Sequence, residues 1–358
     1  MSQPKVLAIH LPQFHPTPEN NEWWGEGFTE WTNVINAKPL FKGHYQPHLP
    51  ADMGFYDLRL PEARQAQAQM AKENNIDGFC YYHYWFGGKR LLHEPIDGIL
   101  ASKTPDLPFC YFWANESWSR RWVGEEKEVL IKQVYSEDDD RAHATWLINS
   151  FKDERYIKIG DRPLFLIYKP YDLPNPQRTM AIFEEVCSEH GIAKPFFVAS
   201  NSHEYEKDPR EFGFDTAIHF QTRHHVLSEF WVDGPSIKKT IRNVLRGIFS
   251  TKLKIYDYAQ YKERVAKINY GYPGFPCVNV TFDNTARRGK KAIVIQGATP
   301  EAFEKSLVEA KVDAQKLPTE QQIIFINAWN EWAEGNHLEP DQKFGHAFLE
   351  VVKRVFRK

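Results

Sequence analysis

Two glutamates, Glu331 and Glu334, stand three residues apart in the segment Asn327-Ala-Trp-Asn-Glu-Trp-Ala-Glu334. If this segment forms one helical turn, both carboxylates lie on the same side of it. Two carboxylates in one apolar site acquire different pKa values, so one can carry a proton while the other stays ionised. Such a pair can break or form an acetal. The alternative is that the two glutamates are unrelated and lie on a surface turn. The flanking tryptophans favour a catalytic site over this alternative.

A second polar segment follows an apolar run that ends at Trp113. Asn115 and Glu116 can each bond neighbouring hydroxyls of a sugar. Trp113 or Trp118 can supply a flat apolar face on which a sugar ring stacks. Arg121 can bind a phosphate or carboxylate of a substrate, or it can tie a nearby glutamate to the loop. Both interpretations of the arginine stay open.

Further polar and aromatic residues stand at expected strand ends or in the segment after the first strand. A lone histidine is more often a buried, hydrogen-bonded core residue than a ligand, but His83 has aromatic neighbours typical of a pocket. Asp283 and Asn284 can bind a hydroxyl or simply cap a turn. The predicted substrate-binding set therefore also includes His10, Gln13, Trp24, Glu30, His83, Tyr84, Trp85, Asp283, Asn284, Trp329, Asn330 and Trp332.

Eight short apolar runs of strand length recur along the chain. They are rich in Val, Ile and Phe with little alternation, which is typical of strands buried on both faces of a parallel sheet. The eight predicted strands are Val6–His10, Gly78–His83, Pro108–Trp113, Pro163–Tyr168, Pro195–Ser200, Thr216–Phe220, Cys277–Phe282 and Ile323–Ala328.

Segments with helical spacing lie between most of these runs. An acidic first turn suits the start of one helix, and a Thr-Pro pair suits the start of another. The predicted helices are Leu60–Asn74, Asp138–Phe151, Pro176–His190 with Gly191 as its cap, one beginning at Thr299, and one near Phe344–Phe356.

Eight strands that alternate with helices in a chain of 358 residues predict a single (β/α)8 TIM barrel spanning 1–358. A doubly wound open sheet is the rival, but no glycine-rich phosphate fingerprint follows the first strand. Insertions at about 11–59 and 221–272 break the repeat, and the second carries a basic stretch, Lys238–Lys254. We expect both insertions to shape the rim of a pocket, because active sites of barrels form among the loops that follow the strands.

Composition narrows the classes of function. The net charge of −2 gives no general attraction to nucleic acid or anionic lipid. Aromatic residues make up 15%, and although most such rings pack in cores, they are also the faces on which sugars stack. No zinc, calcium or phosphate-loop motif is present, so we predict neither a metal ion nor a cofactor.

The four cysteines lack CxxC pairing, which favours a reducing compartment over a disulfide scaffold. No apolar run approaches the roughly 20 residues that span a bilayer. The N-terminal residues lack the apolar stretch and cleavage site of a signal peptide, so a cytoplasmic location is expected. The sequence predicts no oligomeric state.

Four separated segments carry a family resemblance that runs from about Val6 to Val352. They resemble the WbsX-type family, whose members are found with bacterial surface-polysaccharide genes and were named glycosyltransferases. The segments are Trp23-Trp-Gly-Glu-Gly-Phe-Thr-Glu-Trp-Thr-Asn-Val34, Trp113-Ala-Asn-Glu-Ser-Trp118, Asp283-Asn-Thr-Ala-Arg-Arg288 and Asn327-Ala-Trp-Asn-Glu-Trp-Ala-Glu334.

That family is similar in turn to glycoside hydrolase family 99, the endo-α-mannosidases and endo-mannanases, which are (β/α)8 barrels with an Asn-Glu-Trp-x-Glu run after the last strand. The resemblance implies that Glu331 draws the proton from a sugar 2-hydroxyl, whose oxygen attacks its own anomeric carbon. It implies that Glu334 protonates the leaving oxygen and then activates water. The other barrel loops do not resemble those of the mannosidases, so mannose specificity is not carried over.

Three hypotheses follow for the function. The carboxylate pair favours a retaining glycoside hydrolase that acts on a bacterial surface polysaccharide or its precursor, and we place it first. The family name favours a glycosyltransferase in O-antigen or capsular polysaccharide synthesis, although no phosphate-binding helix N-terminus or acidic metal motif is evident. A carbohydrate-binding barrel without activity is the third, and the intact Glu331 and Glu334 count against it.

Overall fold

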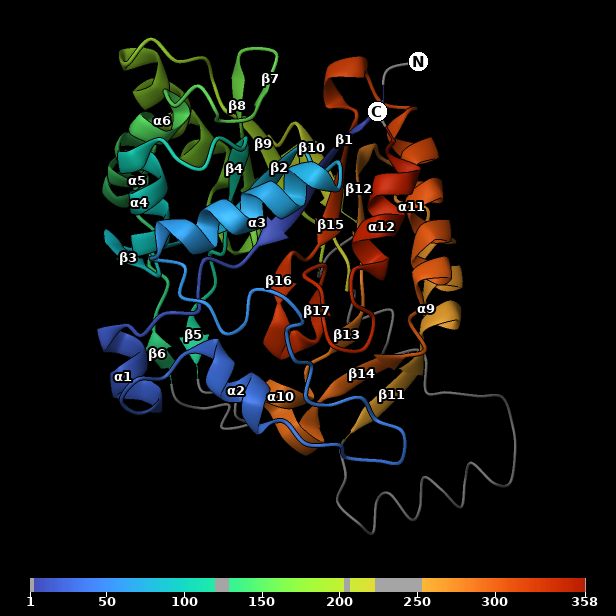
Figure 1. The fold of residues 1–358 in the computed structure, drawn as a ribbon. Coiled ribbons are helices and arrows are strands. Elements are labelled where there is room, and N and C mark those ends of the chain that lie inside the picture. Colours follow the sequence, from blue (N-terminus) through green and yellow to red (C-terminus); the bar gives the residue numbers. More distant parts are fainter. Residues whose placement is uncertain (1–2, 120–128, 203–206, 223–252, 358) are drawn as a thin grey trace.

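The computed structural model describes residues 3–119, 129–202, 207–222 and 253–357. Eight of its strands are parallel and form one barrel, and each overlaps a strand predicted from the apolar runs (Figure 1). These strands are β1 (Lys5–His10), β2 (Gly78–Phe86), β4 (Phe109–Trp113), β8 (Arg162–Ile167), β9 (Phe196–Ser200), β10 (Thr216–His219), β12 (Gly274–Asn279) and β15 (Ile323–Asn327).

The barrel closes through the first strand. β1 pairs in parallel with β15 on one side, with Lys5 opposite Ile323, and with β2 on the other side, with Leu7 opposite Gly78. The order β1-β15-β12-β10-β9-β8-β4-β2 then returns to β1, so these eight strands leave no open edge. The (β/α)8 barrel is thereby confirmed, and the open doubly wound sheet is wrong.

Helices or a 3-10 turn connect consecutive strands and cover the outside of the barrel. The five predicted helices are confirmed within a few residues, and their starts follow the predicted chemistry: Ser136 and Thr299 each accept a backbone N–H of the first turn. The helices are α3 (Pro61–Glu73), α4 (Glu94–Ser102), α5 (Glu137–Phe151), α6 (Pro176–Glu189), α9 (Tyr258–Val265), α11 (Pro300–Ala314) and α12 (Ala347–Val355), and η3 (Pro209–Phe212) joins β9 to β10.

The segment after β1 folds over one end of the barrel. It contains α1 (Pro18–Trp24) and α2 (Glu30–Asn36), which lie at the end opposite the two chain termini, with α2 beside α10 (Thr285–Arg288) (Figure 1). This end is formed by the carboxyl ends of the parallel strands, because β1 runs toward it from the N-terminus. The predicted insertion at 11–59 therefore lies at the expected rim.

The second predicted insertion is described only in part. Residues 223–252, which include most of the basic stretch Lys238–Lys254, lie outside the described residues. From there β11 (Lys254–Asp257) pairs in parallel with β14 (Ile293–Gln296), which pairs with β13 (Phe282–Asp283) in a small separate sheet. The predicted seventh strand, Cys277–Phe282, is thus divided between the barrel strand β12 and this sheet.

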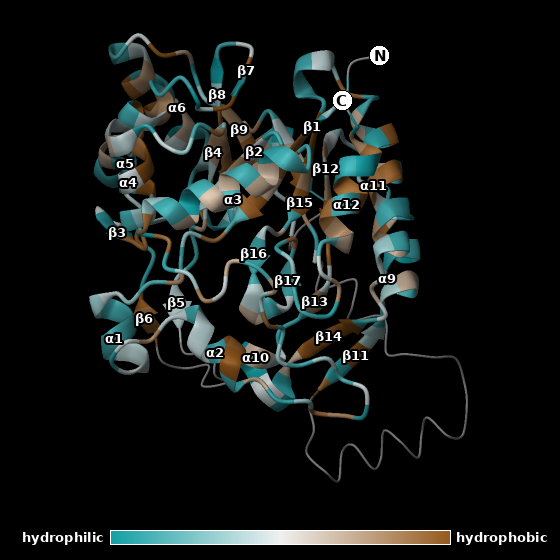
Figure 2. Ribbon diagram, viewed as in Figure 1, coloured by the Kyte–Doolittle hydropathy of each residue, from teal (hydrophilic) through white to brown (hydrophobic). Residues whose placement is uncertain are grey.

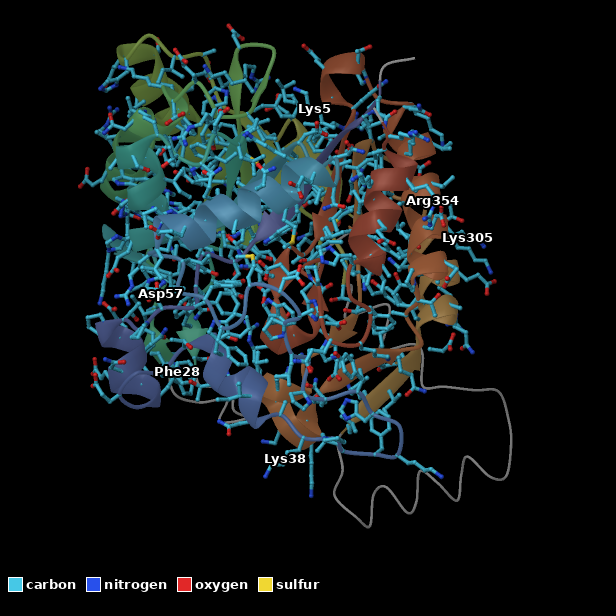
Figure 3. The ribbon with its side chains drawn as sticks, in the orientation of Figure 1. Lys5, Phe28, Lys38, Asp57, Lys305 and Arg354 are labelled. Atoms are coloured by element: carbon cyan, nitrogen blue, oxygen red, sulfur yellow. The ribbon has the colours of Figure 1, made fainter. Side chains whose placement is uncertain are left out.

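Apolar residues are buried in the barrel strands, and polar residues lie on the outer faces of the helices. Hydrophobic colouring concentrates in the strands, whereas α3 and α11 carry hydrophilic residues along their outer sides (Figure 2). Lys305 on α11 and Arg354 on α12 are exposed and point away from the barrel (Figure 3). All four cysteines are buried in the described part of the chain, and none forms a disulfide. Among the described helices, none combines the length and apolar character needed to cross a bilayer.

Candidate active site

The two glutamates lie just after the last barrel strand. Glu331 ends the short strand β16 (Asn330–Glu331), and Glu334 ends the 3-10 turn η6 (Trp332–Glu334). Gly335 follows with φ +52°, and a Cβ there would lie 3.0 Å from the Cβ of Asp283. This tight turn requires glycine, and it returns the chain into β17 (Asn336–His337), which pairs with β16.

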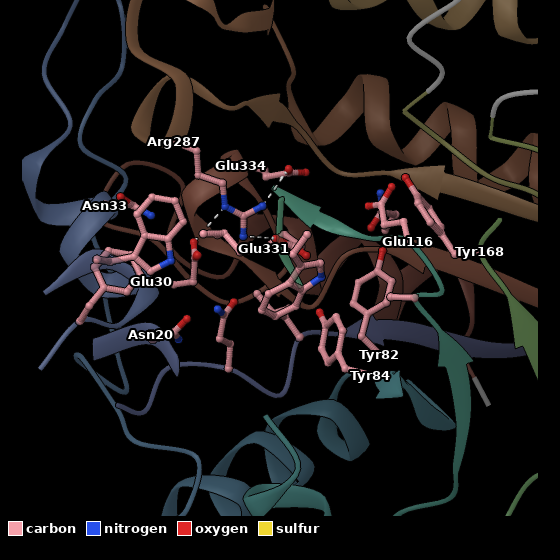
Figure 4. Close-up of a pocket in the computed structure, with 18 of the residues that line it drawn as sticks. Asn20, Glu30, Asn33, Tyr82, Tyr84, Glu116, Tyr168, Arg287, Glu331 and Glu334 are labelled. Atoms are coloured by element: carbon pink, nitrogen blue, oxygen red, sulfur yellow. Dashed lines mark hydrogen bonds and ion pairs between the residues drawn. The ribbon is translucent and has the colours of Figure 1, made fainter. Parts of the chain in front are cut away.

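Both carboxylates face the same guanidinium, as the spacing of three predicted (Figure 4). Arg287 on α10 donates to Glu331 Oε2 at 3.1 Å from Nη2 and to Glu334 Oε1 at 2.8 Å from Nη1. A third carboxylate completes the cluster, since Arg287 Nε donates to Glu30 Oε2 at 3.0 Å. One arginine thus holds three carboxylates from three distant segments.

Burial sets the protonation of this cluster. It raises the pKa of Glu331 to about 8; Arg287 opposes the rise, and Glu334 and Glu30 add to it. Burial also acts to lower the pKa of Arg287, but the three carboxylates raise it, so the guanidinium stays charged. At neutral pH the cluster therefore keeps one proton, because three ionised carboxylates around one cation repel one another.

A cavity opens in front of the cluster at the carboxyl ends of the strands (Figure 4). Half-buried aromatic rings and polar side chains share its wall, which is the composition expected of a site for a polar ligand with apolar ring faces. The cavity is lined by Leu11, Gln13, Asn20, Trp24, Phe28, Glu30, Asn33, Tyr82, Tyr84, Ala114, Glu116, Trp118, Leu130, Tyr168, Phe220, Thr222, Arg287, Asn327, Glu331 and Glu334.

Two amides in this wall have unused hydrogen-bonding atoms. Asn20 Nδ2 and Asn327 Oδ1 are buried, and neither has a hydrogen-bond partner among the described residues. Buried polar atoms in proteins are normally paired. One donor and one acceptor are therefore left for a ligand, and hydroxyl groups can satisfy both.

Eight of the predicted site residues meet at this cavity. Their segments are separated by up to about 320 residues in sequence, and the barrel brings their ends together. The eight are Gln13, Trp24, Glu30, Tyr84, Glu116, Trp118, Glu331 and Glu334.

Three predicted residues on β2 and β4 face the other way. Successive side chains of a strand point to opposite sides, so Tyr82 and Tyr84 line the cavity while His83 and Trp85 turn toward the helices. His83 Nε2 lies 2.9 Å from His143 Nε2, and Trp85 Nε1 donates to Asp139 Oδ1 at 2.9 Å. Trp113 is fully buried and donates from Nε1 to the Trp85 carbonyl at 3.3 Å.

Two tryptophans predicted to bind substrate are held by a buried carboxylate instead. Trp329 Nε1 donates to Glu339 Oε1 at 2.9 Å, and Trp332 Nε1 donates to Oε2 at 2.7 Å. Gln67 Nε2 adds a bond to Oε1 at 2.7 Å and Tyr56 Oη a bond to Oε2 at 2.8 Å. Glu339 therefore fixes both tryptophans that flank Glu331 in sequence.

Four more predicted residues tie the backbone together rather than line the cavity. Asn115 bonds the amide and carbonyl of Lys169, and Asn330 bonds those of Leu11. Asn284 accepts the N–H of Ile293 at 2.8 Å. Asp283 accepts from His44 Nε2 at 2.6 Å and from the Thr285 N–H at 2.9 Å, as the turn-capping alternative predicted. The side chains of these four residues thus form hydrogen bonds within the protein.

The last two predicted residues are His10, which does not line the cavity, and Arg121. His10 is buried, and its Nε2 lies 2.9 Å from Gln67 Oε1. Arg121 lies outside the described residues.

Arg287 is the main site residue that the sequence alone did not single out. It stands within a segment that carries the family resemblance, next to another arginine, and nothing local distinguishes the two. Only Arg287 is buried and faces the carboxylates. The other unpredicted lining residues include Asn20 and Asn33, on helices that the sequence did not predict.

Comparison with known proteins identifies the family. The sequence profile of the family described as Glycosyltransferase WbsX matches residues 6–352. The chain belongs to the WbsX glycosyltransferase family. Two strains of Xanthomonas campestris pv. campestris carry an uncharacterized protein, WxcX, that is 40% and 39% identical over 357 residues, or 99% of this chain. The chain spans about half, 50%, of the length of these curated relatives.

Solved structures share the fold at low sequence identity. The GH99 endo-alpha-mannosidase from Bacteroides thetaiotaomicron is 15% identical, with a TM-score of 0.56 over 98% of this chain and 95% of that one. A glycoside hydrolase-like protein is 11% identical, with a TM-score of 0.58 over 100% and 95%. At these identities the likeness establishes that this WbsX family member has the same barrel fold.

Proposed function

We propose that this chain is a retaining glycoside hydrolase that acts on a bacterial surface polysaccharide or its precursor. The observation that carries the proposal is the convergence of Glu331 and Glu334 on Arg287 at the wall of a cavity with aromatic and amide groups. Catalytic groups of TIM barrels come from this end of the strands. The fold shared with the GH99 endo-alpha-mannosidase supports the assignment.

In the proposed first step, Glu331 takes the proton of the sugar 2-hydroxyl. The 2-oxygen bonds to its own anomeric carbon as the glycosidic bond breaks, and Glu334 gives its proton to the leaving oxygen. A 1,2-anhydro sugar and a free alcohol result. Water then attacks the anomeric carbon, Glu334 takes the proton of the water, and Glu331 returns a proton to the 2-oxygen. Two inversions give net retention.

Arg287 has a positioning and electrostatic role in this scheme. Its three donors hold Glu331, Glu334 and Glu30 at fixed distances of 2.8 to 3.1 Å. Charge moves between the two reacting carboxylates during each step, while the neighbouring cation stays in place. Preorganised charge of this kind is effective where water is excluded, and Arg287 and Glu331 are both buried.

A glycosyltransferase is the second candidate, and the family description favours it. The same two steps support transfer if a sugar hydroxyl replaces water in the second step. Retention of configuration would be the same for both. The hydrolase and the transferase therefore differ only in the sugar donor and in the acceptor, water or a sugar hydroxyl. Analysis of the products distinguishes the two. The third hypothesis, an inactive binding barrel, does not explain why two carboxylates face one cavity beside a buried cation.

The deciding experiment is analysis of the products formed from a panel of bacterial polysaccharides, with and without nucleotide sugars. Release of oligosaccharide without any nucleotide sugar is the expected result. Growth of the glycan only when a nucleotide sugar is present would establish the transferase instead. Binding without any product under both conditions would establish the inactive barrel.

The pH dependence of kcat/KM tests the role of Glu331. The first step needs Glu331 ionised while Glu334 holds the one proton that the pair shares. That proton is lost as pH rises through about 8, the value to which burial raises the pKa of Glu331. We therefore expect kcat/KM to fall about tenfold for each pH unit above 8, because the pair then lacks the proton of the acid. The measurement is kcat/KM from pH 6 to 10. A kcat/KM that stays constant or rises from pH 8 to 10 would contradict this role.

Participation of the substrate is tested with a 2-deoxy sugar. If the 2-oxygen attacks the anomeric carbon, a substrate that lacks this hydroxyl on the reacting sugar is not turned over. The matched control lacks the 2-hydroxyl on the neighbouring, non-reacting sugar and is expected to react. Cleavage of both compounds at the parent rate would rule out the anhydro route while leaving a hydrolase assignment intact.

A further inference from the structure

A cluster of metal-ligand side chains lies behind the hairpin that carries Glu331. His48 comes from the segment between α2 and α3, His337 from β17, and Asp341 from the turn that follows. All three are buried, and their ligand atoms lie within 4.8 Å of one another. His48 Nδ1 is 3.0 Å from His337 Nε2, which is 3.9 Å from Asp341 Oδ2. Ligands of a tetrahedral zinc ion lie about 3.4 Å apart, so small movements would accommodate one.

The surroundings orient two of these three side chains toward a common point. His337 Nδ1 lies 2.9 Å from the carbonyl oxygen of Glu339, which can only accept, so Nδ1 carries the proton and Nε2 presents a lone pair. Asp341 Oδ1 accepts the N–H groups of Lys343 and Phe344 at 3.0 and 2.6 Å, which turns Oδ2 toward His337. A backbone carbonyl behind a histidine is the usual outer support of a metal ligand.

A hydrogen-bonded histidine pair accounts for only part of this geometry. His48 Nδ1–H can donate to His337 Nε2, but the 3.9 Å from that atom to Asp341 Oδ2 is beyond hydrogen-bond distance. A cation between the three could be bound by one nitrogen of each imidazole and by the Asp341 carboxylate, which the Tyr45 hydroxyl also approaches. His48 also lines a second cavity, beside His44 and Tyr45, which gives an ion a route and leaves room for a water ligand.

We propose that His48, His337 and Asp341 bind a divalent transition-metal ion, with Zn²⁺ preferred, and that water completes its coordination. Two imidazoles and one carboxylate suit zinc better than calcium or magnesium, which prefer oxygen ligands. No short sequence motif contains this site, because His48 and His337 are 289 residues apart.

The ion has a structural role beside the catalytic hairpin. His337 pairs with Asn330 across the two strands, and the Trp332 ring stacks on it at 3.8 Å between centroids. An ion at His337 would fasten this hairpin to the segment that carries His48. It touches neither Glu331 nor Glu334, so the site stands independently of the proposed hydrolysis.

Zinc binding by the chelator-treated, dialysed protein tests the proposal. We expect one Zn²⁺ per chain by elemental mass spectrometry and a higher melting temperature with zinc, because the ion binds the folded state. Asp341→Asn keeps an oxygen for the two backbone N–H groups but loses the charged ligand, and His48→Gln removes one imidazole. Each is expected to weaken zinc binding more than about 100-fold, beyond the effect of losing an outer-shell partner.

The matched control is His346→Gln, which removes an exposed histidine that pairs with Asp52 at 2.7 Å. It is expected to bind zinc as the wild type does. X-ray absorption of the zinc-loaded wild type should show histidine nitrogens at about 2.0 Å, a result that does not depend on any variant folding. A wild type that binds no zinc, an unchanged affinity in folded Asp341→Asn and His48→Gln, or a spectrum without histidine ligands would each overturn the proposal.

Discussion

Glu334→Gln is expected to reduce kcat by about 10²–10⁴-fold, the usual contribution of a general acid and base. The substitution keeps the shape of the side chain and leaves an oxygen that can accept from Arg287, now 2.8 Å away. In the proposed scheme, it removes the proton that the leaving oxygen needs. About a quarter of the Glu334 side chain is exposed, and this residue lines the cavity, so no buried contact of the core is lost.

The measurement is kcat and KM on the polysaccharide identified by product analysis, together with the circular dichroism spectrum. Glu116→Gln is the matched control, because Glu116 lines the same cavity and pairs with Lys169 at 4.0 Å instead of Arg287. In the proposed scheme Glu116 binds substrate, so its loss is expected to act mainly on KM. A folded Glu334→Gln protein with kcat near the wild-type value would remove Glu334 from the mechanism.

Glu339→Gln is expected to lower the free energy of unfolding by about 2–4 kcal/mol. Four donors converge on this buried carboxylate, two on each oxygen. A glutamine has one oxygen, so its amide nitrogen would face two donors. Tyr56 can rotate its hydroxyl to accept, but the indole N–H groups of Trp329 and Trp332 cannot accept. At least one buried donor therefore loses its partner.

The comparison with wild type is best made at pH 8.5 by urea unfolding. Burial raises the pKa of Glu339 to about 7, against the hydrogen bonds that lower it, so the wild-type side chain is ionised at that pH. Because the folded-state pKa is raised, the wild type loses stability as pH rises through 7, and the difference from the variant is expected to be larger below that pH. Glu320→Gln, an exposed position, is the control. A Glu339→Gln variant within about 0.5 kcal/mol of wild type would contradict this role.

The sequence by itself determined the barrel and the pairing of Glu331 with Glu334. Eight apolar runs of strand length, separated by segments with helical spacing, are a local pattern, and seven of the eight observed strands match their predicted run closely. The spacing of Glu331 and Glu334 is also local, because three residues make about one turn whether the turn is α or 3-10. Both side chains lie on the same side of this turn, and both carboxylates consequently face Arg287.

The tertiary structure decided which residues meet. Arg287 lies 44 residues before Glu331 and 257 after Glu30, and no local pattern distinguishes it from Arg288. The fold likewise brings His48 to His337 and Asp341, although His48 and His337 are 289 residues apart.

The tertiary structure also decided which face of each strand forms the site. Every strand of the barrel is buried toward the axis and toward the helices, so its sequence shows no alternation between polar and apolar residues. Tyr82 and Tyr84 cannot be told from His83 and Trp85 by such a pattern. The same holds for Trp329 and Trp332, whose rings suit a sugar but whose N–H groups bind the distant Glu339.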